Sequence, residues 1–228
     1  MNILIIDTAT EACSVALEIN KHVFNRFEIC PQQHSQRILP MIDEVLKEAN
    51  VTLMDLDYLA FGRGPGSFTG VRIATGVLQG LALGTGHQVV GISTLAAMAQ
   101  QAYAQNKSEY VCAAIDARMS EVYFGQYRLQ QNVMTLMGEE QVLPPEQGAI
   151  LLSDSFETKG VGTGWQAYPE LNAMDKVDVL FDIFYPNALH MLPLAKALIA
   201  DGQAVEVEDI QPVYLRDKVT WKKLPGRE

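Results

Sequence analysis

Ile3-Leu4-Ile5-Ile6-Asp7-Thr8 opens the chain as four consecutive apolar residues followed by an acid and a hydroxyl. A short apolar run of this kind predicts a buried strand. Residues 14–19 and 23–29 then alternate roughly between polar and apolar on either side of a turn, which predicts a hairpin. The same order recurs later, because residues 110–115 also lead into an aspartate and residues 121–129 also alternate. The sequence therefore predicts two halves with one topology.

The predicted fold class is a duplicated α/β fold with two small subdomains and mixed sheets, the ribonuclease H-like architecture of actin, hexokinase and sugar kinases. The polar stretch Asn106-Lys107-Ser108 is the predicted boundary, which gives an N-terminal actin-like subdomain at 1–106 and a C-terminal one at 107–228. We expect further helices at 35–49, 71–84, 94–105, 145–152 and 187–200, and further strands at 58–61, 88–92 and 158–162.

In that architecture, nucleotide phosphates lie between the halves, at the loops that follow the first strand of each. Here those loops read Asp7-Thr8-Ala9-Thr10 and Asp116-Ala117-Arg118-Met119-Ser120, and neither contains a glycine. Both are therefore poor phosphate cradles. We expect Asp7 and Asp116 to bond the N–H groups of their own turns. An ATP-dependent kinase or ATPase is thus the alternative function, not the favoured one.

A glycine-rich loop, Gly62-Arg63-Gly64-Pro65-Gly66-Ser67-Phe68-Thr69-Gly70, leads into a helix in which Gly76, Gly80 and Gly84 share one row. Glycine inside a helix costs about 0.5–1 kcal/mol relative to alanine, so three in one row predict the close approach of another backbone. That backbone belongs either to another subunit or to this chain's own core, and the sequence leaves both alternatives open.

The composition is that of an ordinary globular protein, with a net charge of −10 from 17 Lys and Arg against 27 Asp and Glu. This balance opposes strong binding of a polyanion by the chain alone. A basic segment around Trp221, from Arg216 to Arg227, is predicted to be a solvated tail. Three scattered cysteines indicate neither a disulfide framework nor a zinc cluster. With no membrane span and no signal peptide visible, a cytoplasmic location is expected.

Four motifs together resemble the bacterial TsaB (YeaZ) family. They are Ile6-Asp7-Thr8-Ala9-Thr10, His34-Ser35-Gln36-Arg37-Ile38-Leu39-Pro40, Gly64-Pro65-Gly66-Ser67-Phe68-Thr69-Gly70-Val71-Arg72 and Gly91-Ile92-Ser93-Thr94-Leu95. The resemblance covers essentially the whole chain and implies a non-catalytic partner in making threonylcarbamoyladenosine, the modified base beside the anticodon of certain tRNAs. It also implies a heterodimer with the catalytic paralogue, TsaD, and a small ATPase, TsaE, that docks on the pair.

The catalytic paralogue carries an H-x-x-x-H metal pair just after the strand that corresponds to residues 88–92. Here Ser93-Thr94-Leu95-Ala96-Ala97-Met98 stands in that place, and the hydroxyl of Thr94 and the thioether of Met98 bind iron or zinc poorly. We therefore predict no metal site and no catalytic residue. A metallopeptidase, an old label of the wider family, has no support in these residues.

We predict an apolar, pseudo-symmetric interface with the TsaD-type paralogue, or with a second copy of this chain when the paralogue is absent. It lies in the N-terminal subdomain, and tRNA is reached only through the complex. Its predicted residues are His34, Ile38, Ile42, Val45, Thr69, Arg72, Ile73, Gly76, Val77, Gly80, Leu81 and Gly84. The chain has no predicted cofactor of its own. A nucleotide at the subunit junction is left open, and its candidate contacts are Asp7, Thr8, Arg63, Gly64, Gly66 and Ser67.

Overall fold

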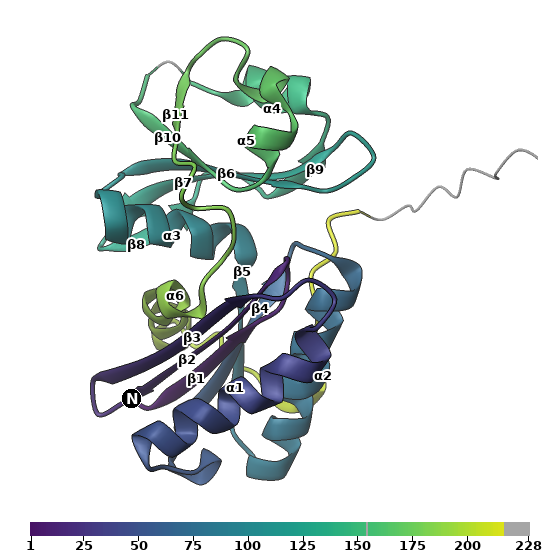
Figure 1. The fold of residues 1–228 in the computed structure, drawn as a ribbon. Coiled ribbons are helices and arrows are strands. Elements are labelled where there is room, and N and C mark those ends of the chain that lie inside the picture. Colours follow the sequence, from purple (N-terminus) through teal and green to yellow (C-terminus); the bar gives the residue numbers. More distant parts are fainter. Residues whose placement is uncertain (154, 217–228) are drawn as a thin grey trace, which may run out of the picture.

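The structure is a computed structural model that describes residues 1–153 and 155–216. It contains two β-sheets, each covered by helices on both faces (Figure 1). The predicted tail around Trp221 lies outside the described residues. None of the helices that the structure describes is long and apolar enough to cross a membrane.

The first sheet has the strand order β3-β2-β1-β4-β5. Its strands are β1 (Ile3–Asp7), β2 (Ala12–Ile19), β3 (His22–Ile29), β4 (Tyr58–Gly64) and β5 (Val89–Ser93). β1 pairs antiparallel with β2 and parallel with β4, so it lies in the middle of the sheet. All five of its residues are buried, which explains why its sequence is a continuous apolar run.

The second sheet repeats this plan with the order β11-β10-β6-β7-β8. Its strands are β6 (Tyr110–Asp116), β7 (Val122–Gln130), β8 (Val133–Leu136), β10 (Thr158–Val161) and β11 (Val177–Val179), and β9 (Gln141–Leu143) pairs with β7. As in the first sheet, the strand that comes first in the sequence lies in the middle. Here it is β6, which pairs antiparallel with β7 and parallel with β10. The predicted duplicated α/β fold with two mixed sheets is confirmed.

One face of the first sheet is covered by α1 (His34–Ala49) and α2 (Phe68–Thr85), which lie side by side (Figure 1). Both helices pack on a core that includes Leu4, Ile6 and Leu17. Pro40 lies inside α1, which begins at His34, six residues earlier. Because α2 ends at Gly86 in the left-handed conformation, its last turn is closed by a residue that favours that backbone.

The other face of the first sheet is covered by α6 (Ala188–Ala200), although this helix comes from the second half of the chain. Its Met191 and Ala195 are fully buried in that contact. The Lys196 ammonium lies 2.6 Å from both carboxylate oxygens of Glu18 on β2. The boundary between 1–106 and 107–228 stays a prediction, and α6 belongs by its packing to the first sheet.

The second sheet lies between α3 (Thr94–Asn106) on one face and α4 (Pro145–Leu151) with α5 (Gly164–Ala167) on the other. α3 contributes Leu95, Met98 and Ala102 to the core on its side. In the part of the chain that the structure describes, short 3₁₀ turns occur at Leu53–Asp55, Pro169–Asn172 and Val207–Asp209. The three cysteines are buried and form no disulfide.

Candidate functional site

The glycine-rich loop is packed against the loop that follows β1. The Ser67 amide donates to the Ala9 carbonyl at 2.7 Å, and the Thr8 hydroxyl donates to the Gly70 carbonyl at 2.6 Å. A methyl group at Gly66 would lie 2.3 Å from the Ala9 oxygen, and one at Gly70 would lie 2.0 Å from the Thr8 oxygen. Both glycines are therefore required by close contact with this chain's own backbone.

The same loop begins α2. Ser67 is the N-cap residue, and its hydroxyl accepts a hydrogen bond from the Gly70 amide at 3.0 Å. The amides of Ser67 and Gly70 are thus both engaged within the chain, so neither is free to hold a phosphate. The loop connects β4 to α2 and holds the start of that helix against the loop that follows β1.

Asp7 lies at the end of β1 and is completely buried. Its Oδ1 accepts a hydrogen bond from the Ala9 amide at 3.3 Å, while its Oδ2 has no hydrogen-bond partner among residues 1–153 and 155–216. Burial raises the pKa of this carboxyl to about 7, and the hydrogen bond from Ala9 opposes the shift. The predicted role in bonding its own turn agrees with this contact.

Asp116 occupies the equivalent position after β6 and is engaged on both oxygens. Its Oδ1 accepts hydrogen bonds from the Arg118 amide at 2.8 Å and from the Tyr168 hydroxyl at 2.9 Å. Its Oδ2 forms an ion pair with the Arg118 guanidinium at 2.6 Å. Every contact made by Asp116 here is with its own subdomain, so the carboxylate holds the turn.

A cleft of about 580 Å³ separates the ends of β1 and β6. Of the six candidate nucleotide contacts, only Gly66 and Ser67 line it. Asp7, Thr8 and Gly64 are buried away from it, and the side chain of Arg63 lines a different cavity. These six contacts were predicted for the subunit junction and not for this cleft, so they stay a prediction.

The three glycines in the middle of α2 face outward. Gly76, Gly80 and Gly84 are exposed, and within the described part of the chain no other segment comes within 4 Å of where a side-chain carbon would stand. This arrangement decides against one of the two alternatives left open by the sequence, since the glycine row is not covered by this chain's own core.

We call the exposed side of α2 the glycine face. Its residues are Thr69, Arg72, Gly76, Gly80, Leu83 and Gly84. Leu83 is 70% exposed and was not among the predicted contacts. The predicted contacts Ile73, Val77 and Leu81 lie beside this face, half-buried against the core under α1 and α2. A partner on the glycine face would meet only their outer edges.

The predicted contacts from α1 are corrected. Ile38, Ile42 and Val45 are 0%, 3% and 0% exposed and belong to the core under the helix, so they hold α1 in place and do not face a partner. Leu39, which was not predicted, is 52% exposed. His34, also predicted as a partner contact, is the first residue of α1 and is 8% exposed.

One end of the glycine face is bordered by the last described segment of the chain. The Arg72 guanidinium lies 3.6 Å from the centre of the Phe68 ring, and its Nε donates to the Tyr214 hydroxyl at 2.8 Å. The Val213 amide donates to the Arg63 carbonyl at 2.8 Å. This segment therefore runs alongside the glycine loop, and the ring of Tyr214 extends the surface of α2.

The position of the paralogue's metal pair holds buried side chains here. Thr94 and Met98, at the start of α3, are both completely buried. Among the residues that the structure describes, no group of three or more His, Cys, Asp or Glu side chains could hold a metal ion.

Comparison with known proteins identifies the family to which this chain belongs. A family model described as "TsaD: tRNA N6-adenosine threonylcarbamoyltransferase" matches residues 27–219. The tRNA threonylcarbamoyladenosine biosynthesis protein TsaB of Escherichia coli K12 is 50% identical over 100% of both chains. The chain belongs to the TsaB family.

Solved structures agree with this assignment. YeaZ from Pseudomonas aeruginosa is 48% identical and superposes with a TM-score of 0.89 over 94% of this chain and 99% of its own. A second structure from P. aeruginosa, 47% identical with the same TM-score and coverage, is described as an uncharacterized protein with similarity to peptidase YEAZ. The TsaB fold is thus shared over nearly the whole chain.

Proposed function

We propose that this chain acts in tRNA threonylcarbamoyladenosine biosynthesis as a non-catalytic scaffold that pairs through the glycine face with a TsaD-type catalytic subunit. The name of the E. coli relative supplies the pathway. The match of the TsaD family model over residues 27–219 supports a partner of the same fold. Two related subunits can then pack equivalent helices against each other in a pseudo-symmetric interface.

The exposed glycine row is the observation that carries this proposal. Gly76, Gly80 and Gly84 weaken an isolated helix, and no other segment of residues 1–153 and 155–216 packs on their bare backbone. A helix from another subunit gains most from such a row, because the absence of side chains lets the two axes come close together. Leu83 on the same face and Leu39 on the neighbouring helix α1 are exposed apolar residues. A second copy of this chain fits the same face when the paralogue is absent.

The two strand-end aspartates weigh against the alternative of a kinase or ATPase. Asp7 is buried with a raised pKa, and Asp116 is held by Arg118 and Tyr168. Asp7 does not line the cleft, and Asp116, which does, has both oxygens engaged, so neither carboxylate is free to bind a metal–nucleotide complex or activate a nucleophile. A nucleotide at the subunit junction remains compatible with Gly66 and Ser67, which line the cleft.

The remaining partners follow from charge. With a net charge of −10, the chain needs another subunit to hold tRNA, so we propose that tRNA is bound only by the complex. A TsaE-type ATPase would dock on the joint surface of the pair. A cytoplasmic location and the absence of any cofactor of its own stay predictions.

The decisive experiment changes Gly80→Leu and measures co-purification with the TsaD-type subunit. The added side chain projects into solvent in the isolated chain, so the fold should survive, while a closely packed partner helix should be excluded. Ala104→Leu, at an exposed position of α3 on the other sheet, is the matched control and should bind normally. Circular dichroism should show both variants folded.

Reconstitution of the modification on unmodified tRNA completes the test. The scaffold role requires that product formation needs this chain and fails with Gly80→Leu. Normal pairing by Gly80→Leu would show that the interface lies elsewhere. Phosphate release from ATP by the isolated chain, abolished by Asp7→Ala, would favour the kinase.

A further inference from the structure

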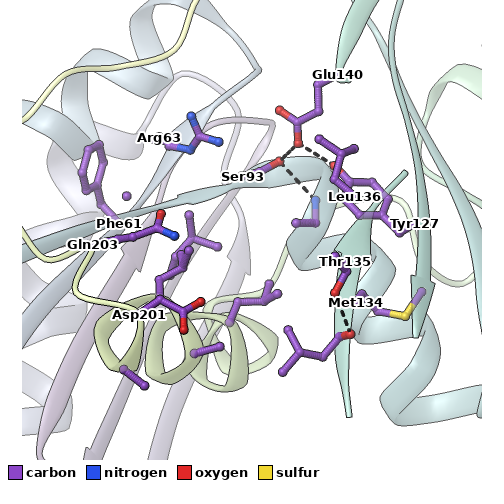
Figure 2. A pocket seen from close by; sticks show the side chains of 18 of the residues that line it. Phe61, Arg63, Ser93, Tyr127, Met134, Thr135, Leu136, Glu140, Asp201 and Gln203 are labelled. Carbon is purple, nitrogen blue, oxygen red and sulfur yellow. Dashed lines mark hydrogen bonds between the residues drawn. The ribbon is translucent and has the colours of Figure 1, made fainter. Parts of the chain in front are cut away.

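A second cavity, of about 1270 Å³, lies away from the glycine face and shares no lining residue with the cleft between β1 and β6. It is bounded by the edge strand β5, by α6 with the segment that follows it, and by β7 and β8 of the second sheet. Figure 2 shows side chains from both sheets directed into it. The cavity therefore exists only because the two halves of the chain are folded together.

Arg63 supplies the only basic side chain in the described lining of this cavity. Its backbone is fixed by the hydrogen bond from the Val213 amide, and its Cβ and Cδ lie 3.1 Å from where a side-chain carbon of Gly91 would stand. Within the described ranges, its guanidinium makes no hydrogen bond or ion pair, although the residue is half-buried. A held but unpaired guanidinium is suited to a carboxylate, which it can bind through two parallel hydrogen bonds.

Glu140 supplies the opposite charge from the second sheet. Its Oε1 accepts hydrogen bonds from the Ser93 hydroxyl and, at 2.5 Å, from the Tyr127 hydroxyl (Figure 2). Burial, reinforced by the charge of Glu140, raises the pKa of the Tyr127 phenol well above its usual value, so the phenol stays a donor. Ser93 is itself fixed as the N-cap of α3, where it accepts from the Ala96 amide at 3.2 Å. The carboxylate is thus immobilised through one oxygen.

The second oxygen of Glu140 is free to accept. For Oε2 there is no hydrogen bond in the part of the chain that the structure describes, since both donors go to Oε1. Two further carboxylates, Asp201 and Asp209, also line the cavity. Their negative charge favours a ligand with an ammonium group and disfavours a polyphosphate. An apolar wall accompanies these charges and consists of Phe61, Val133, Leu136, Leu194 and Leu198.

A cation and an anion therefore line one cavity without pairing with each other. We propose that this cavity binds a free α-amino acid with an apolar side chain, its carboxylate on Arg63, its ammonium on Glu140 and its side chain on the apolar wall. A zwitterion satisfies both charges at once, whereas a simple carboxylate or a simple amine satisfies one. The site is independent of the proposed scaffold function, because it uses no residue of the glycine face.

Isothermal titration of the full chain with L-leucine, L-methionine and L-phenylalanine tests the proposal. At least one should bind, and 2-phenylethylamine and 3-phenylpropionate, which each lack one charged group of phenylalanine, should bind at least about tenfold more weakly than phenylalanine if phenylalanine is the ligand. Arg63→Gln and Glu140→Gln should each weaken binding about tenfold or more. Arg128→Gln, exposed and outside the lining, should leave it unchanged.

The variants also separate binding from folding. Glu140→Gln keeps an oxygen for Ser93 and Tyr127, and Arg63→Lys keeps a positive charge. Both variants are therefore expected to fold and to retain weakened but measurable binding. Absence of saturable binding of all three amino acids up to about 10 mM would overturn the proposal. So would binding that survives both Arg63→Gln and Glu140→Gln, because the ligand would then lie elsewhere. Pairing with the TsaD-type subunit should be unaffected in every case.

Discussion

A side-chain carbon at Gly62 would lie 1.8 Å from Oδ2 of Asp7. The bare backbone of β4 thus covers the carboxyl group at the end of the neighbouring strand β1 and keeps water and other side chains away from it. This contact explains why Asp7 is completely buried and why its pKa is raised to about 7. The aspartate that ends the first apolar run and the glycine that begins the glycine loop therefore pack directly against each other.

The raised pKa of Asp7 predicts a stability that depends on pH. The carboxyl titrates at about 7 in the folded chain and near 3.8 when unfolded, so the folded state binds the proton more tightly between these values. Stability should therefore fall as pH rises from about 4 to about 7, by up to about 4 kcal/mol. Below about pH 4 the carboxyl is protonated in both states, so it no longer makes stability depend on pH.

Asp7→Asn isolates this contribution, because it keeps the oxygen that accepts from the Ala9 amide but never ionises. In urea denaturation the variant should gain stability relative to the natural chain on going from about pH 4 to about pH 8. If the difference in stability between Asp7→Asn and the natural chain is the same at both pH values, folding does not raise the pKa of Asp7.

Two glycines of α2 should respond to alanine in opposite ways. Gly70→Ala would place a carbon 2.0 Å from the Thr8 carbonyl oxygen, so a loss of about 2–4 kcal/mol is expected. Gly76→Ala meets open space among the described residues and should stabilise the isolated chain by about 0.5–1 kcal/mol. Urea midpoints of the two variants make the comparison within one helix. Equal destabilisation by both would contradict the exposed glycine row.

Breaking the ion pair between Lys196 and Glu18 should loosen α6 from the first sheet. The Glu18 side chain is 9% exposed, so Lys196→Met leaves a nearly buried carboxylate without its partner. We expect a loss of about 2 kcal/mol, less than for a completely buried pair because the lysine is 41% exposed.

Lys159→Met is the matched control, since its partners Glu157 and Asp178 are 86% and 67% exposed. Its cost should stay below about 1 kcal/mol. Thermal or urea unfolding of the two variants checks the difference, and a larger loss for Lys159→Met would reverse the expected order.

Arg72 should hold the segment around Tyr214 against α2. Arg72→Ala removes both the contact with the Phe68 ring and the hydrogen bond to the Tyr214 hydroxyl, together about 1–2 kcal/mol. The Val213 amide, bonded to the Arg63 carbonyl, should then exchange its hydrogen about tenfold faster. Tyr214→Phe loses only the hydrogen bond and should show a smaller increase. Unchanged exchange in Arg72→Ala would show that the segment is held by other contacts.

Local sequence patterns predicted the longer elements well, but of the strands with only three or four residues they predicted β10 alone among those described. The apolar runs at β1 and β6 and the alternation in β2, β3 and β7 carry enough residues to reveal their pattern. β8, β9 and β11 have four, three and three residues and were missed. Such short segments become strands because a neighbouring strand offers backbone partners, which no local pattern encodes.

The candidate site shows a second limit of local sequence patterns, which do not indicate what a helix face packs against. The spacing of Ile38, Ile42 and Val45 predicted one helix face correctly, but that face packs on the chain's own core. Periodicity shows which residues share a face and not what the face meets. For the glycine row the same ambiguity was left open, and the exposed position of α2 resolved it.

The amino-acid sequence by itself determined the duplicated topology, the two helices beside the glycine loop and the family, because these depend on periodicity and on motifs that are continuous along the chain. Only the tertiary structure decided that the glycine row faces outward, that α6 returns to the first sheet and that Arg63 and Glu140 line one cavity. Those relationships join residues far apart in the chain. They are fixed by which surfaces exclude water together, a property of the folded molecule.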